Sequence, residues 1–251
     1  MSASTPLDAS SHRLGVGGSA LGRAQDTSQL STDPRATPNP SRATGHTRHR
    51  TLFLKRIVDV AGAVLGLIVF SPVLVLAVLW ISAVDGGQPI FRQERLGLHG
   101  KFFVIYKFRT VRAQYNDPTG RTIFGREDAR LLPLGSFMRA SRLDELPQLV
   151  NILRGDMSLV GPRPHVPHMI VDGQDYGSLV PLYDRRTEMV PGLTGWAQCN
   201  GLNGPVRTQQ EAEARLDHDL VYLQRFSIGF DLKIMARTVF HVLAALRQWP
   251  N

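Results

Sequence analysis

The hydrophobic pattern of the chain is dominated by one apolar stretch, from Val60 to Val84, in which no residue carries a formal charge. A straight helix over this stretch is roughly 37 Å long, at about 1.5 Å per residue, which exceeds the hydrocarbon core of a bilayer, about 30 Å. The pattern therefore predicts a membrane helix.

Ser71 and Pro72 interrupt this stretch near its middle. Proline lacks the N–H that would donate to the carbonyl of Ile68, so a kink or a break is expected there. Backbone groups freed at that point would need Ser71, neighbouring protein or water as partners. Each arm would be roughly 18–20 Å long, too short to cross a bilayer alone.

Both flanks of the stretch are basic, with Lys55 and Arg56 before it and Arg92, Arg95 and Lys101 after it. Basic flanks stay on the cytoplasmic side of a membrane, so a segment that enters and leaves on the same face fits better than a span. We expect residues 51–85 to form a re-entrant membrane hairpin broken at Ser71-Pro72. A single-pass helix with a tolerated proline is the main alternative, and a buried soluble helix is a weaker one.

After the apolar stretch the pattern is that of a folded cytosolic domain. Two strand-like runs, 89–93 and 102–108, suggest a hairpin. Apolar residues follow helical spacing over the ranges 131–139, 142–154, 179–187 and 209–224. The segment 231–249 combines an apolar face with basic residues, which predicts a core helix or an amphipathic helix in the membrane interface. The expected fold class is α+β, mainly helical, with residues 86–251 forming a small cytosolic α/β catalytic domain.

Composition predicts a disordered N-terminal tail and anionic partners. Residues 1–50 hold few apolar residues and no aromatic ones, so we expect a disordered basic tail. The chain carries 29 Lys+Arg against 21 Asp+Glu, a formal charge of +8, which favours phosphate groups or an anionic membrane face as partners. Cys199 is the only cysteine, which excludes a disulfide within the chain.

The densest group of candidate catalytic residues surrounds the adjacent carboxylates Asp144 and Glu145. They precede or begin a helix, depending on whether Ser141 caps it or Pro147 is its first residue. The positive end of a helix dipole favours both as carboxylates, the state needed for a nucleophile or a metal ligand. Acidic residues in a first turn usually serve only the dipole, so the pair alone is a weak signal.

Rigid loops with arginines and polar side chains strengthen the case for a catalytic site at Asp144 and Glu145. Arg139 lies just before the pair, and the prolines around Arg163 stiffen its loop, which suits binding of phosphate oxygens. A second loop rich in Pro and Gly, 190–201, displays Trp and Gln side chains, including Gln198. Loops of this kind present binding groups on a rigid scaffold.

Six motifs then point to one family. They are Lys55–Asp59 (KRIVD) leading into the interrupted apolar helix, Phe91–Gly100 (FRQERLGLHG), Tyr106–Thr110 (YKFRT), Ser141–Gln148 (SRLDELPQ), Gly155–Pro164 (GDMSLVGPRP) and Pro191–Gln198 (PGLTGWAQ). Over roughly Leu54 to Leu243 the chain resembles the bacterial sugar transferase family, the monotopic phosphoglycosyl transferases that start glycan assembly on a polyprenol phosphate carrier.

The resemblance implies a covalent reaction in two steps. Asp144 would attack the sugar-proximal phosphorus of a UDP-sugar bound with Mg²⁺, and UMP would leave. Undecaprenyl phosphate would then accept the sugar phosphate, giving undecaprenyl-diphospho-sugar, the first step of exopolysaccharide, O-antigen or glycoprotein glycan assembly. Glu145 is implied as the Mg²⁺ ligand.

It also implies roles for residues around that pair. Arg139 and Arg163 would bind phosphate, Lys107 and Arg109 match a basic tract near the site, and the region from Gln198 would help to shape the sugar pocket. The Ser71-Pro72 pair matches the break of a re-entrant hairpin. The motif residues at the membrane boundary are Lys55, Arg56 and Asp59.

The implied setting is the bacterial inner (cytoplasmic) membrane, with the catalytic domain on its cytoplasmic face. Membrane lipid is an expected partner and nucleic acid is not, because the basic residues form no continuous stripe with aromatics; a homodimer is left open. Two other functions stay open from the residues alone. One is a membrane-anchored adaptor without turnover, and the other is a membrane-bound Mg²⁺-dependent phosphatase or pyrophosphatase.

Overall fold

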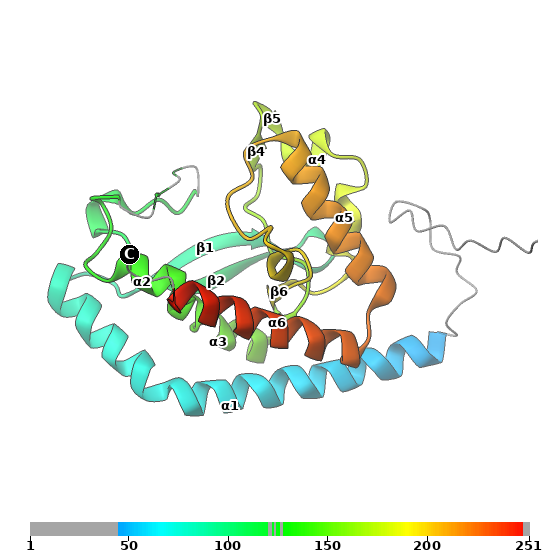
Figure 1. Ribbon diagram of the computed structural model, residues 1–251, viewed down its shortest axis with the longest axis horizontal. Helices are drawn as coiled ribbons and strands as arrows, with labels where there is room; N and C mark the ends of the chain where they lie inside the picture. Colours follow the sequence, from blue (N-terminus) through cyan, green and yellow to red (C-terminus); the bar gives the residue numbers. More distant parts are fainter. Residues whose placement is uncertain (1–44, 120–121, 123, 126–127, 248–251) are drawn as a thin grey trace, which may run out of the picture. The chain divides into compact units, whose positions relative to one another are not determined.

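The computed structural model describes residues 45–119, 122, 124–125 and 128–247. The chain divides into two units, Met1–Thr32 and Asp33–Asn251, and every described residue lies in the second. The expected disordered tail therefore lies, up to residue 44, outside the described residues. The described part mixes helices and strands, which confirms the α+β class (Figure 1).

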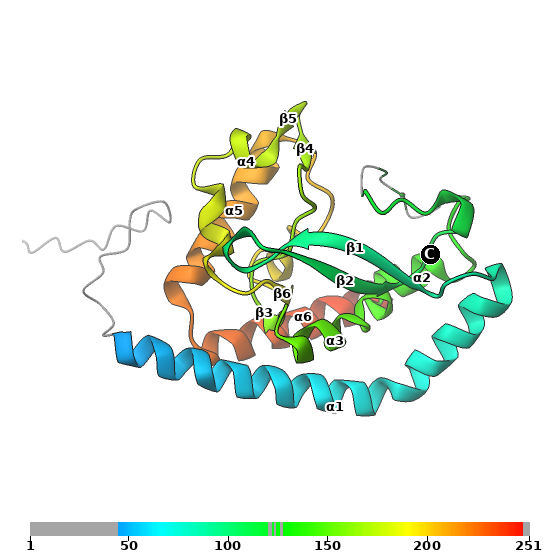
Figure 2. The same cartoon turned by 180° about the vertical axis from the view of Figure 1, so that it is seen from behind.

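Helix α1, Gly45–Asp85, contains the whole apolar stretch. It runs as one helix through Pro72 and bends in the cyan part of the ribbon, the part of the colour scale that includes Pro72 (Figures 1 and 2). Of the kink or break expected at this point, the structure has a kink within one continuous helix, and the re-entrant hairpin stays a prediction. The physical reason lies in Ser71, whose Oγ donates to the carbonyl oxygen of Ile68 at 2.8 Å. This side chain replaces the bond that Pro72 removes.

The same helix begins six residues inside the segment 1–50 for which we expected disorder. Once a helix is nucleated, each added residue gains a hydrogen bond, so a strong apolar helix extends into polar residues before it. The helix therefore starts before residue 51, where we expected the membrane segment to begin.

Most of the apolar side chains on α1 face outward. Of the described helices, the span Arg50–Asp85 is long and apolar enough to cross a membrane, and few of its residues are buried. Its inward face carries Gly62 and Gly66, where a Cβ atom would lie 2.6 Å from Leu159 and 3.1 Å from Leu149. These glycines let α1 approach the rest of the protein closely, while its outer face is left for an apolar environment.

Three charged side chains of α1 attach it to the domain. Lys55 Nζ donates to Asp231 Oδ2 at 2.7 Å, and Asp59 Oδ1 accepts from the backbone N–H of Leu159 at 2.9 Å. Arg56 donates from two nitrogens to the carbonyls of Ile152 and Leu153, at 2.6 and 3.0 Å. These residues, expected at the membrane boundary, therefore join the apolar helix to α3 (Gln148–Arg154), β3 (Ser158–Val160) and α6 (Ile228–Arg247).

The predicted hairpin is present. Strands β1, Ile90–Leu96, and β2, Phe102–Phe108, pair in antiparallel register, with Ile90 opposite Phe108. Two other pairs follow: β3, Ser158–Val160, lies parallel to β6, Gly192–Thr194, and β4, Ile170–Val171, lies antiparallel to β5, Gln174–Asp175.

The helices after the hairpin are shorter than the sequence suggests, except at the C-terminal end. They are α2, Gly135–Ala140, α3, Gln148–Arg154, α4, Tyr176–Leu179, α5, Gln209–Arg225, and α6, Ile228–Arg247. The 3-10 turns η4, Leu143–Glu145, and η5, Tyr183–Glu188, replace parts of the expected helices. The left-handed residues Leu134, Arg142 and Leu182 stand just before α2, η4 and η5, and they shorten the expected helices because an α-helix does not continue through positive φ.

Two apolar clusters hold α1 against the site elements. Its first arm packs Ala63 against Ile105 of β2 and Ile152 of α3. Its second arm packs Ile81 against Phe108 and Met138. On the other side of β1 and β2 lie β4, β5 and the start of α5 (Figures 1 and 2). The hairpin thus lies between the apolar helix and the α5 region.

Candidate active site

The carboxylate pair lies in the short turn η4, between α2 and α3. Arg142, with φ of 60°, starts this turn in the left-handed conformation, which is uncommon for a residue with a side chain. Ser141 ends α2 and donates to the carbonyl of Phe137 at 2.8 Å, so it does not cap a helix at the pair. Pro147 is the N-cap of α3, and the pair therefore precedes that helix.

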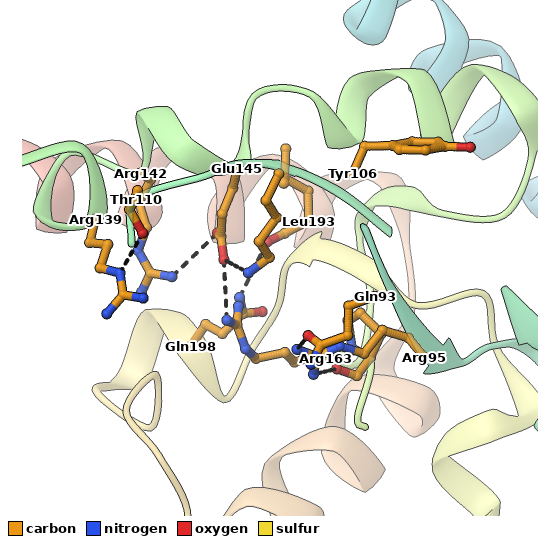
Figure 3. A network of polar contacts seen from close by, with 12 residues as sticks. Gln93, Arg95, Tyr106, Thr110, Arg139, Arg142, Glu145, Arg163, Leu193 and Gln198 are labelled. Carbon is orange, nitrogen blue, oxygen red and sulfur yellow. Dashed lines mark hydrogen bonds and ion pairs between the residues drawn. The ribbon is translucent and has the colours of Figure 1, made fainter. Parts of the chain in front are cut away.

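Glu145 is enclosed by cations (Figure 3). Its Oε1 accepts from Lys107 Nζ at 2.9 Å and from Arg163 at 3.2 Å, and its Oε2 accepts from Arg142 at 3.3 Å. Burial would raise the pKa of Glu145, but the neighbouring charges of Lys107, Arg163 and Arg142 outweigh it and hold the pKa well below its usual range. Glu145 is therefore ionised at neutral pH, as expected.

Asp144 is in the opposite situation. Its Oδ1 is buried and has no hydrogen-bond partner among the described residues. Burial, together with the adjacent charge of Glu145, raises the pKa of Asp144 to about 6. The two carboxylates therefore differ in pKa, because desolvation and the like charge of Glu145 outweigh the nearby cations at Asp144. Near neutral pH it is still mainly ionised, and one of its oxygens is free to react.

Arg139 lies on α2 with its guanidinium toward the same site. Its Nε donates to Thr110 Oγ1 at 2.9 Å, and the guanidinium carbon lies 5.3 Å from the centre of the Phe124 ring. Thr110 lies two residues after the end of β2, so the hairpin orients this arginine. The contact uses one nitrogen and leaves the forked end of the guanidinium for an anion.

The loop that carries Arg163 is fixed by close backbone packing between β3 and β6. Gly161 and Gly192 lie so close that a Cβ atom on either would collide with the backbone of the other segment. Arg186 then donates to the carbonyl oxygen of Arg163 at 2.6 Å. The glycines of the GPRP and PGLTG motifs thus position Arg163 beside Glu145.

Two of the expected phosphate-binding residues have other partners. Arg109 is buried; its guanidinium donates to Asp85 and Gly86 O at the end of α1 and to Gln88 O at 3.0 Å, so it connects that helix to β2. Its role as a phosphate ligand stays a prediction. Gln198 donates to Leu193 O at 3.2 Å, and its buried Oε1 has no partner among the described residues.

One open cavity of about 2460 Å³ joins these groups. Its walls include every predicted catalytic and phosphate-binding residue, namely Asp144, Glu145, Lys107, Arg109, Arg139, Arg163 and Gln198. Apolar side chains of α6, among them Val239, Val242 and Leu243, line another part of it, as does Phe70 of α1. The cavity therefore has charged and apolar walls.

Sequence reasoning missed several arginines of this cavity as site residues, among them Arg95, Arg142 and Arg215. Arg142 was visible beside the carboxylate pair, and Arg95 lies within the FRQERLGLHG motif. Arg215 had no local signal, since an arginine on an amphipathic helix normally faces solvent. It is only 6% exposed.

The carboxylate pair also fits a Mg²⁺ site that substrate completes. No group of three or more His, Cys, Asp or Glu side chains that could hold a metal occurs in the described ranges. Mg²⁺ in proteins that act on phosphates is usually held by one or two carboxylates, substrate oxygens and water. Glu145, with the partnerless oxygen of Asp144 beside it, suits that kind of site better than a closed protein cage.

Comparison with known proteins decides the family. The family described as bacterial sugar transferase matches residues 50–245. The chain belongs to the bacterial sugar transferase family. Membership confirms the resemblance seen in the motifs and places the chain among transferase enzymes.

Three relatives illustrate this bacterial sugar transferase's similarities. UDP-glucose:undecaprenyl-phosphate glucose-1-phosphate transferase of Escherichia coli (strain K12) is 41% identical over 187 residues, which cover 74% of this chain and 39% of the relative. Exopolysaccharide production protein PSS of Rhizobium leguminosarum bv. phaseoli is 40% identical over 188 residues, 75% of this chain and 94% of the relative. A Caulobacter vibrioides protein with the same name as the E. coli one is 43% identical over 185 residues, 74% of this chain and 68% of the relative.

The chain thus spans less than half of the E. coli relative and nearly all of the Rhizobium one. The long, outward-facing apolar helix, together with relatives named for undecaprenyl-phosphate, indicates membrane association.

Proposed function

We propose that this bacterial sugar transferase moves a sugar-1-phosphate from a UDP-sugar to undecaprenyl phosphate through a covalent phosphosugar-Asp144 intermediate. The reaction follows the names of its relatives and the chemistry of the cavity. The observation that carries it is the contrast within the carboxylate pair. Asp144 has a buried oxygen without a partner, whereas its neighbour Glu145 is bound by three cations.

In the first step a carboxylate oxygen of Asp144 attacks the sugar-proximal phosphorus. The bond from that phosphorus to the bridging oxygen breaks, and the electron pair leaves on UMP. Carboxylate and diphosphate repel each other, so the step requires positive charge around the phosphates. Lys107, Arg139 and Arg163 line the cavity and supply it.

In the second step an oxygen of undecaprenyl phosphate attacks the same phosphorus. The acyl-phosphate bond breaks and Asp144 recovers its carboxylate, so no proton or electron is left unaccounted for. A covalent intermediate lets a water-soluble donor and a lipid acceptor use one site in turn. The apolar wall formed by α6 and Phe70 suits the prenyl chain.

Glu145 would hold Mg²⁺ together with diphosphate oxygens. When bound, the ion would neutralise charge on the diphosphate. Because Lys107, Arg142 and Arg163 contact Glu145 in this structure, we expect these side chains to turn toward the phosphates when substrate and metal arrive.

We further propose that α1 is re-entrant, enters and leaves the inner membrane on its cytoplasmic face, and holds the catalytic domain there. The bend near Pro72 and the bond from Ser71 to Ile68 support a helix that turns within the lipid. Contacts of Lys55 and Arg109 support both ends of α1 staying with the domain, because each end is tied to it by buried charges. A helix that spans the membrane would instead place one of its ends on the opposite side, away from the domain.

The experiment that tests the reaction is a UMP-release assay with purified protein, UDP-glucose, Mg²⁺ and undecaprenyl phosphate. Other UDP-sugars follow if glucose is not transferred. The proposal expects formation of undecaprenyl-diphospho-sugar together with UMP. Release of sugar phosphate to water without a lipid product would favour the phosphatase, and no release with any UDP-sugar would favour the adaptor.

A further inference from the structure

A group of arginines lies around His165, two residues after Arg163 in the chain. Four guanidiniums, those of Arg95, Arg163, Arg186 and Arg215, are close enough to lower the pKa of the His165 imidazole, although its burial is the largest cause of that shift. His165 is 4% exposed and its pKa lies well below its ordinary value, so it is neutral and adds no charge. The group therefore consists of four cations around a neutral ring.

Neighbouring carboxylates neutralise only part of the positive charge of these four arginines. Asp219 lies 2.8 Å from Arg186, and Glu145 lies 3.2 Å from Arg163. Glu145 also forms ion pairs with Lys107 and Arg142, so its charge is shared. No salt bridge involving Arg95 or Arg215 is found in the described part of the chain. A buried charge without a counterion is costly, so the group has a strong preference for an anion.

Arg95 and Arg215 each keep an unused donor. Arg95 donates to Pro164 O at 3.1 Å and to Gln93, and Arg215 donates to Gly204 O at 2.7 Å. The Nε atoms of both are buried without a partner among the described residues. The pKa of Arg95 is lowered to about 9 and that of Arg215 to about 10, in each case by burial first and by Arg163 next. Both side chains line the same cavity as Asp144.

We propose that Arg95, Arg163 and Arg215 form a subsite for the phosphate of a nucleoside monophosphate, the group that leaves when Asp144 attacks. This inference rests on the proposed function. Within the cavity Arg163 connects the carboxylate pair with the other two arginines. It contacts Glu145, and its charge is close enough to lower the pKa of Arg95 and of Arg215. Forked guanidiniums suit a phosphate with several free oxygens.

The position of the subsite favours the nucleotide over the lipid phosphate. Arg215 lies on α5, whose start lies across β1 and β2 from the apolar helix α1 (Figures 1 and 2). The apolar cavity wall belongs instead to α6 and Phe70 of α1. A prenyl chain is expected at that wall, and a water-soluble nucleoside at the polar end.

Equilibrium binding of UMP to the purified full chain tests the subsite without turnover. Arg95→Gln and Arg215→Gln should each raise the UMP dissociation constant by on the order of tenfold, because each removes a charged hydrogen-bond donor. Binding of uridine, which has no phosphate, should not change. Arg185→Gln is the matched control, since Arg185 pairs with Glu188 at 3.2 Å, is partly exposed and does not line the cavity.

Variants that fail to fold are replaced by Arg95→Lys and Arg215→Lys, which keep the charge and lose the fork, and a smaller loss of UMP affinity is expected. UMP binding equal to wild type in the substituted proteins would overturn the subsite. So would weakened binding of undecaprenyl phosphate with unchanged UMP binding, which would assign the phosphate to the lipid. Wild-type protein that binds UMP in this arginine-dependent way but releases none from any UDP-sugar would contradict only the proposed function.

Discussion

Asp144 and Glu145 are adjacent in the chain but differ sharply in their partners. Both oxygens of Glu145 accept from cationic side chains, whereas Oδ1 of Asp144 is buried without a partner in the described part of the protein. A carboxylate left in this state is costly to the folded protein, and such cost is common where a group must stay reactive.

The first prediction concerns that cost. Asp144→Asn should lose transfer activity and keep or raise the melting temperature by a few degrees in buffer without Mg²⁺, because it removes a buried charge beside Glu145. Differential scanning fluorimetry beside the UMP-release assay measures both effects. A clear drop in melting temperature would show that Asp144 stabilises the fold, contrary to the structure.

A second prediction tests Glu145 as the metal ligand. Glu145→Gln should raise the Mg²⁺ concentration needed for half-maximal UMP release, because a neutral amide binds a hard cation more weakly than a carboxylate. Glu188→Gln, at an exposed position paired with Arg185, is the control. An unchanged Mg²⁺ requirement in a Glu145→Gln protein that retains activity would place the ion elsewhere.

The ion pair between Lys55 and Asp231 gives a third prediction. Lys55→Met should destabilise the protein by about 3–5 kcal/mol, since it leaves the carboxylate of Asp231 buried without its partner. Lys55→Met/Asp231→Asn should recover part of that loss, and Lys101→Met, at an exposed site, should have little effect. Denaturant unfolding in detergent provides the measurement. Equal unfolding free energies for Lys55→Met and wild type would mean that this pair does not fasten α1.

A fourth prediction addresses topology. Cysteines introduced singly at Ser41 and Ser82 should both be protected from a periplasmic thiol reagent in intact cells. Asp85 is a poor probe position, because its carboxylate pairs with Arg109 and accepts from the Ala113 N–H at 2.7 Å. Cys199 is buried, so background labelling should be low.

Pro72→Ala sharpens the same test. It restores the N–H that can donate to Ile68 O, so α1 should straighten and span more often, with new labelling at one of the two positions. Labelling of Ser41→Cys but not Ser82→Cys in the otherwise unchanged protein would contradict the re-entrant arrangement.

Local patterns predicted a large part of this fold. The β1–β2 hairpin followed from two short apolar runs around a glycine-containing turn, and the need for Ser71 at the bend followed from the carbonyl that Pro72 leaves free. The carboxylate pair Asp144 and Glu145 was recognised from its motif. The motif did not predict that Asp144 and Glu145 differ in pKa and in hydrogen-bond partners. Burial and neighbouring charges cause this difference, and they arise only when β2 and the Arg163 loop come together.

Other features depend on contacts between residues far apart in the sequence. Arg215 joins the cavity from α5, and Arg186 supports Arg163 from η5, with no pattern around either residue to indicate it. Arg109 belongs to a basic tract, yet its donors are taken by the end of α1. Charge and motif membership indicated which residues lie near the site. Packing between distant segments decides which of these side chains keep hydrogen-bond donors available for a substrate.

The covalent intermediate is the central claim, and one measurement tests it most directly. Purified protein is mixed with Mg²⁺ and a UDP-sugar labelled in its sugar, without any lipid acceptor, and UMP and protein-bound label are followed together. We predict a burst of UMP up to one equivalent of enzyme, with matching label on the peptide that contains Asp144 and none in Asp144→Asn. UMP formed only after undecaprenyl phosphate is added, with no labelled protein at any time, would contradict the account and indicate direct transfer.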